Sequence, residues 1–152
     1  MELRDIKIKL YEMCDIYVQE RIDRAQSAIA EAQKAANNES KSSAGDKYET
    51  GRAMMHLEKE KHASQLSEAV KLKQVLDQIN PDLALSAIGL GAIVETNQGY
   101  FYFAIGAGKL SLEGKDYFAI APAAPIGQKL MGLQVGESTT FNGRTFQVLA
   151  LA

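Results

Sequence analysis

Cysteine is nearly absent from this sequence, since Cys14 is the only one in 152 residues. A single cysteine excludes an internal disulfide framework and fits a reducing compartment. An excess of charge of one sign is also lacking, because the formal net charge is −2. Proteins that are held to nucleic acid by their overall electrostatic field carry a strong positive excess, so the sequence does not favour that class.

Long apolar runs are missing as well. The longest weakly polar stretch, residues 83–94, is too short to span a bilayer and contains two glycines. The N-terminal sequence MELRDIKIKL is charged from its second residue and has no signal-peptide core. We therefore expect a cytoplasmic protein without a membrane partner.

Residues that could carry stand-alone catalysis are scarce. His56 and His62 do not have the spacing of a metal-binding pair on one helix face, which is four positions. No nucleophile elbow or Cys–His–acid group can be built, and the glycines of residues 105–110 lack the length and the terminal Ser or Thr of a phosphate-binding loop. We interpret Cys14, Met54 and Met55 as core residues. An acyl-transfer enzyme that uses Cys14 is therefore only a weak alternative. We expect no enzyme.

Glycine and proline are absent from residues 3–36, where apolar residues recur at steps of three and four. This pattern predicts a long helix with one buried seam, which narrows largely to alanine between Ala25 and Ala36. A rougher stripe predicts a second helix from about residue 46, which Pro81 closes. Two such helices with a short polar connection predict an antiparallel coiled-coil hairpin over residues 1–80, with its tip near residues 38–47. Each helix would reach roughly 45–50 Å, so we expect the tip to project into solvent or into a partner.

Residues 81–152 have a different pattern. Asn97-Gln98-Gly99 and Asn142-Gly143 each lie between β-type runs and predict hairpins, and DYFAIA is a further candidate strand. Pro125 can begin a short helix and Gly132 can end it. The sequence thus predicts an α+β protein, in which a second domain forms a small, mostly antiparallel sheet of roughly four to six strands with one short helix.

The segment YFAIAPAAPIGQKLMGLQVGESTTF, residues 117–141, resembles the signature of the Gre transcript-cleavage factor family. In that family a strand leads into Ser-Pro-(Ile/Leu)-(Gly/Ala)-x-x-Leu-(Leu/Ile)-Gly-x-x-x-Gly-(Asp/Glu). The matching residues are Pro125, Ile126, Gly127, Leu130, Met131, Gly132, Gly136 and Glu137, with Ala124 where Ser is usual. YETGR, residues 48–52, resembles the Tyr-x-x-x-Arg that opens the second helix of the family.

The resemblance implies an FKBP-like C-terminal domain that docks on the rim of the RNA polymerase secondary channel. The docking contact would be formed by Pro125, Ile126, Leu130 and Met131. The coiled coil would run toward the polymerase active site and the nascent RNA. The protein would then be a monomeric transcription elongation factor that stimulates transcript cleavage in backtracked complexes. A prolyl isomerase or another binding module is an alternative, although the domain lacks the signature of an aromatic-lined pocket.

The resemblance also implies that tip carboxylates help to hold a second Mg²⁺, shared with the polymerase active site, while the isolated protein holds no metal. Aligned on Tyr48 and Arg52, the acidic positions of the family fall on Lys41 and Ala44. A Mg²⁺ site built from acids nearby would have a different spacing. A channel-occupying regulator without cleavage activity is therefore the alternative function. The candidate tip residues are Glu39, Lys41, Asp46, Tyr48, Glu49 and Arg52. In the simpler interpretation Glu39 and Asp46 are solvated cap residues, Tyr48 packs on the end of the hairpin and Arg52 is an exposed helix residue.

Overall fold

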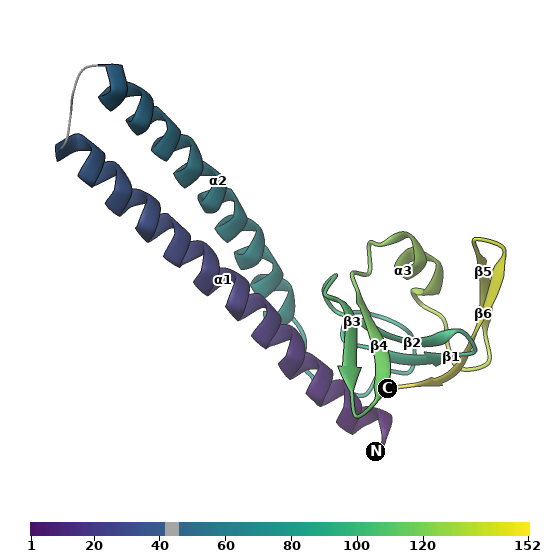
Figure 1. Cartoon of the computed structure of the whole chain (residues 1–152). Helices are drawn as coiled ribbons and strands as arrows, with labels where there is room; N and C mark the ends of the chain where they lie inside the picture. The colour runs from purple at the N-terminus through teal and green to yellow at the C-terminus, as the bar shows by residue number, and fades with distance from the viewer. Residues whose placement is uncertain (42–45) are drawn as a thin grey trace. The chain divides into compact units, whose positions relative to one another are not determined.

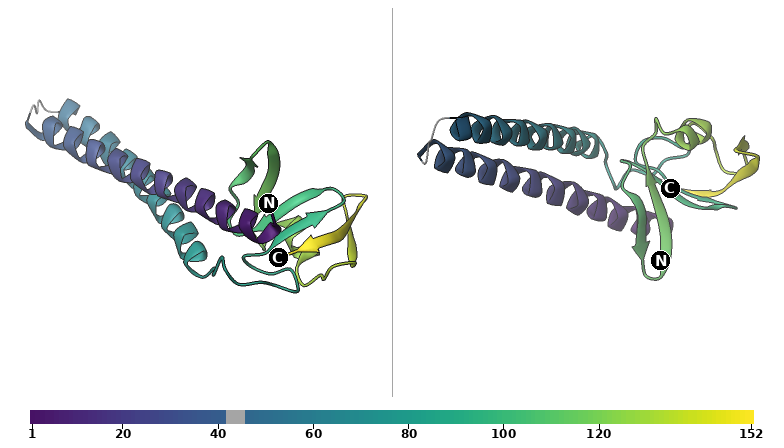
Figure 2. Two further views of the ribbon diagram at one scale, coloured as in Figure 1. Left: turned by 90° about the horizontal axis from the view of Figure 1, so that it is seen from below. Right: turned by 45° about the horizontal axis from the view of Figure 1, so that its top comes forward.

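The computed structural model describes the backbone of residues 1–41 and 46–152 and the side chains of residues 1–38 and 51–152. Two long helices, α1 (Leu3–Lys41) and α2 (Asp46–Asp77), pack together as an antiparallel hairpin (Figures 1 and 2). The predicted hairpin is therefore confirmed. Residues 42–45 of its expected tip lie outside the described residues.

Helix α2 ends slightly earlier than the sequence predicts. Its last helical residue is Asp77, and the amides of Gln78 and Ile79 donate to the carbonyl oxygens of Val75 and Leu76 at 3.1 Å. These bonds span three residues and tighten the end of the helix, a common way to satisfy its last carbonyl groups. Pro81 follows and has no amide hydrogen to continue the helix.

The second half of the chain forms a six-stranded sheet with the order β3-β4-β2-β1-β6-β5. All neighbouring strands are antiparallel except β2 and β4, which are parallel. One short helix, α3 (Pro125–Leu130), connects β4 to β5. The predicted α+β class is confirmed. The strands are β1 (Ile93–Thr96), β2 (Gly99–Phe103), β3 (Gly108–Leu112), β4 (Lys115–Ile120), β5 (Ser138–Phe141) and β6 (Arg144–Leu151).

The turns that the sequence predicts join strands as expected. Asn97 and Gln98 connect β1 to β2, where the Thr96 hydroxyl donates to the Gly99 carbonyl oxygen at 2.8 Å. Asn142 and Gly143 connect β5 to β6 with φ values of 52° and 75°, the left-handed conformation that a tight hairpin turn requires. Strand β3 and its turn at residues 113–114 were not predicted. The glycines at and before the start of this edge strand weaken the β-type pattern of its sequence.

One face of the sheet packs against α3. Register places Val94 of β1 beside Phe101 of β2, and the next inward-facing residue of β2, Phe103, is fully buried. Leu130 of α3 has no exposed surface and completes this core. The buried members of the cluster are Ile88, Ala92, Val94, Phe103, Leu130, Phe146 and Val148.

The opposite face of the sheet lies in one compact unit with the start of α1. The chain divides into a sheet unit, residues 1–17 with 74–152, and an arm unit, residues 18–73. Register places Ile93, Tyr102 and Ala119 on this second face, which we call the tyrosine face, and all three are buried. The pKa of Tyr102 is raised, chiefly by burial and to a smaller extent by the neighbouring Cys14 and Tyr11 of α1.

Polar groups of α1 fasten the loop after α2 within the sheet unit. The buried amine of Lys7 donates to the carbonyl oxygen of Leu83, and burial lowers the pKa of this lysine. The Tyr11 hydroxyl donates to the carbonyl oxygen of Leu76 at 3.1 Å. Cys14 is fully buried, as expected, and burial raises its pKa to about 12.

The compact units divide within both long helices, whereas the sequence predicts a division between residues 80 and 81. The predicted boundary separates the two types of secondary structure, and it stays a prediction. A fragment that begins at residue 81 would lack residues 1–17, and the buried tyrosine face of its sheet would lose that part of the unit. Tests of the sheet unit therefore need the whole chain.

Two tyrosines beside each other in the sheet unit should respond oppositely to loss of their hydroxyl groups. Among the residues that the structure describes, the Tyr102 hydroxyl is buried without a hydrogen-bond partner, whereas the Tyr11 hydroxyl is bonded to Leu76. We expect Tyr102→Phe to raise the free energy of unfolding by about 1 kcal/mol and Tyr11→Phe to lower it by about 1 kcal/mol. Urea denaturation of both variants measures this, and destabilisation by Tyr102→Phe would mean that its hydroxyl has a partner.

Candidate functional surfaces

The predicted tip residues lie at the ends of the two long helices. Glu39 and Lys41 belong to α1, and Asp46, Tyr48 and Glu49 belong to α2, but their side chains lie outside the described residues. Arg52 is described, and its side chain is exposed. The carboxylates on which a shared Mg²⁺ site would depend are therefore not placed. Among the residues that the structure does describe, no group of three or more His, Cys, Asp or Glu side chains could hold a metal ion.

An exposed apolar pair lies on α2 close to these residues. Met54 and Leu57 are separated by three positions and are 60% and 65% exposed. The interpretation of Met54 as a core residue is wrong, because the two-helix arm has no third layer to cover this side of α2. Beside the pair, His56 Nε2 lies 3.3 Å from Glu60 Oε1 on an exposed face.

Several residues of the signature-like segment build α3 itself. Pro125 occupies the first turn, where a missing amide hydrogen costs no helical hydrogen bond. Gly127 packs so closely that an added Cβ would lie 2.6 Å from the Ala121 carbonyl oxygen and 2.8 Å from that of Pro122. Leu130 is fully buried in the sheet core.

The remaining signature residues form the loop after α3. Gly132 and Gly136 have φ values of 83° and 93°, which residues with a side chain rarely adopt. Their amides donate to the carbonyl oxygens of Ile88 and Val148, both at 2.8 Å. The Glu137 carboxylate accepts a hydrogen bond from the Gln134 amide at 2.8 Å. These residues are thus required by the local fold, whatever the protein binds.

The structure shows how accessible the expected docking residues are. Leu130 has no exposed surface, so its side chain can act only by holding α3 in place. Ile126 is half-buried against the sheet core, while Pro125 is exposed. The accessible apolar residues of the loop are Met131 and Val135, which are 40% and 59% exposed. Sequence reasoning missed Val135, although an apolar residue beside turn-forming Gly136 could have indicated it.

Comparison with known proteins does not assign the chain to a family. No protein-family model matches it, and a search of curated proteins finds no match. In the part of the chain that the structure describes, none of the helices combines the length and apolar character needed to cross a bilayer.

The close approach at Gly127 makes a direct prediction. Alanine in place of glycine usually favours a helix by about 1 kcal/mol, but here the new methyl group would meet backbone oxygen atoms. We expect Gly127→Ala to lower the free energy of unfolding by about 1–3 kcal/mol. Gly106→Ala is the matched control, because an added Cβ there has no atom within 4 Å and its φ lies outside the left-handed region. Equal denaturation midpoints for the two variants would contradict the packing of α3.

Proposed function

We propose that this protein is a transcription elongation factor that binds in the RNA polymerase secondary channel. The observation that carries the proposal is the combination of two features on one chain. A long antiparallel helical hairpin precedes a small six-stranded sheet, and the signature-like segment forms the short helix and the loop that accompany the sheet. This agrees with the layout that the resemblance to the Gre transcript-cleavage factors implies.

In this proposal the sheet unit docks on polymerase through the loop of residues 131–135. Met131 and Val135 offer apolar surface, and the loop backbone is held by bonds such as Ile88 N to Leu133 O at 2.8 Å. A loop that is already ordered loses little conformational freedom on binding, which favours affinity. The exposed pair Met54 and Leu57 gives the arm an apolar contact of its own.

The tip composition favours a second version of the function. Lys41 and Ala44 stand where the resemblance places acids, so the positive charge of Lys41 opposes a Mg²⁺ ion nearby. A regulator that occupies the channel without stimulating cleavage needs the docking surface and the arm, but no metal-binding acids. The two versions share the polymerase and differ in their effect on backtracked transcripts.

Docking can be tested with the whole chain and purified RNA polymerase from the same organism. We expect Met131→Lys with Val135→Lys to weaken binding about tenfold or more, because a lysine ammonium buried at an apolar contact loses its hydration. Ile16→Lys is the matched control, since Ile16 is a 57% exposed apolar residue on α1, outside this loop. Absence of binding by the unmodified protein would refute the proposed function, whereas equal weakening by both variants would refute only the docking surface.

The tip can be tested separately in a transcript-cleavage assay on backtracked complexes. We expect Lys41→Asp with Ala44→Glu to increase cleavage, because it restores two carboxylates for a shared Mg²⁺. Ala30→Glu with Lys34→Asp makes the same charge change on exposed positions of α1 outside the tip and should leave cleavage unchanged. We also expect Glu39→Ala with Asp46→Ala to abolish any cleavage by the unmodified protein. Strong cleavage that survives this loss would show that the chemistry lies elsewhere.

A further inference from the structure

Strand β6 departs from regular pairing at Leu149. Register joins Thr96 of β1 to Val148, and the next pair joins Glu95 to Ala150. Two residues of β1 thus face three residues of β6. Within the described sheet, Leu149 is the extra residue of a β-bulge and has no counterpart in β1. Pairing is regular again from Ala150 to the end of the strand, so the irregularity concerns this one residue.

The bulge presents an apolar side chain to solvent. Leu149 is 47% exposed, whereas Val148 immediately before it is buried in the sheet core. A β-bulge interrupts the ladder and changes the direction of a side chain, and bulges are common beside functional sites for this reason. Single exposed apolar residues are ordinary on protein surfaces, so the surroundings of Leu149 decide whether the bulge has a role in binding.

The backbone of Val148 connects Leu149 to the proposed docking loop. The Gly136 amide donates to the Val148 carbonyl oxygen at 2.8 Å, and the Val148 amide donates to the Glu137 carbonyl oxygen at 2.9 Å. Leu149 follows Val148 in the chain, and Val135 precedes Gly136. Each of these exposed apolar residues is therefore one position from the same backbone bond, and the bulge lies beside the loop.

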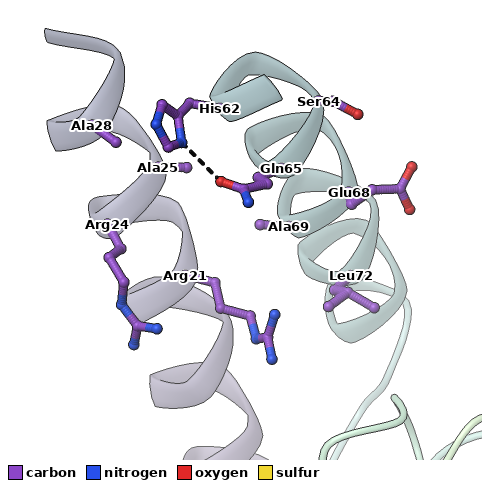
Figure 3. A pocket seen from close by; sticks show the side chains of 10 residues that line it. All are labelled: Arg21, Arg24, Ala25, Ala28, His62, Ser64, Gln65, Glu68, Ala69 and Leu72. Carbon is purple, nitrogen blue, oxygen red and sulfur yellow. Dashed lines mark hydrogen bonds between the residues drawn. The ribbon is translucent and has the colours of Figure 1, made fainter. Parts of the chain in front are cut away.

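The arm unit shows the more usual use of apolar side chains. Ala25 of α1 and Ala69 of α2 are buried where the two helices face each other (Figure 3). These side chains serve the packing of the arm itself. Leu149 serves no comparable packing, because the residue of β6 that fills the sheet core at this point is Val148.

We infer that Leu149 is a third apolar contact of the docking surface, beside Met131 and Val135. The inference rests on the proposed function and names the same partner, RNA polymerase. Each of the three side chains adds affinity in proportion to the apolar area that binding removes from water. Pairing with β1 holds the backbone on both sides of the bulge, so Leu149 is already positioned and loses little conformational freedom on binding.

Binding of the whole chain to purified RNA polymerase tests the contribution of Leu149. We expect Leu149→Lys to weaken binding about fivefold or more, because a lysine ammonium at an apolar contact loses its hydration. Leu149→Met keeps an apolar side chain of similar size and should bind as the unmodified protein does. Deletion of Leu149 removes the extra residue and leaves a regular ladder, and it should also weaken binding severalfold. Ile16→Lys is again the control.

Cysteine variants distinguish direct contact from an effect on the fold. The native thiol of Cys14 is fully buried and its pKa is raised to about 12, so it reacts slowly with maleimides. Leu149→Cys and Ile16→Cys each add one exposed thiol. We expect bound polymerase to slow alkylation of Leu149→Cys about fivefold or more, and to leave alkylation of Ile16→Cys nearly unchanged.

The outcomes separate this inference from the proposed function. Absence of binding by the unmodified protein would refute the proposed function, and the role of Leu149 with it. If Met131→Lys with Val135→Lys weakens binding while Leu149→Lys and the deletion do not, the docking loop stands and the role of Leu149 is overturned. Equal protection of the two added thiols would overturn it as well.

Discussion

The burial of the first residues of α1 in the sheet unit is the constraint on which the rest of the structure depends. A six-stranded sheet has two faces to cover, and α3, with six residues, packs on only one of them. Ile6, Leu10 and Cys14 of α1 are buried in the unit that contains the tyrosine face of the sheet. The sheet thus obtains a cover without a further element, and α1 continues from the sheet unit into the arm unit as one helix.

Lys7 connects the beginning of α1 to the loop that follows α2. A buried ammonium is unfavourable unless it is hydrogen-bonded, and the Leu83 carbonyl oxygen supplies the bond. Leu83 follows α2, so the bond joins the beginning of one helix to the chain that leaves the other. The Tyr11 bond to Leu76 acts in the same place. In the sheet unit, the start of α1 is therefore held to the end of α2 and the loop after it by hydrogen bonds among buried apolar residues. In the arm unit, the buried contacts between the two helices are made largely by alanines.

Local signals in the sequence were sufficient for much of the fold. The long helices follow from apolar spacing without glycine or proline, and the hairpin at Asn142-Gly143 follows from its turn residues. The parallel pairing of β2 with β4 and the burial of α1 beside Tyr102 were not predicted, because both join residues far apart in sequence. The exposure of Met54 was missed for a related reason: an apolar residue on a helix does not reveal that the arm has no third layer.

The candidate site was less predictable than the fold because most residues of the signature-like segment serve the fold. Gly127 is required by a backbone contact, Gly132 and Gly136 by left-handed turns, and Leu130 by the core. A sequence that preserves them preserves the α3 region, and it leaves Met131 and Val135 as the exposed apolar residues of the loop. Fold and activity can consequently separate within one chain. Lys41 ends α1 outside the sheet unit, so its charge can change while the exposed apolar residues of the loop remain.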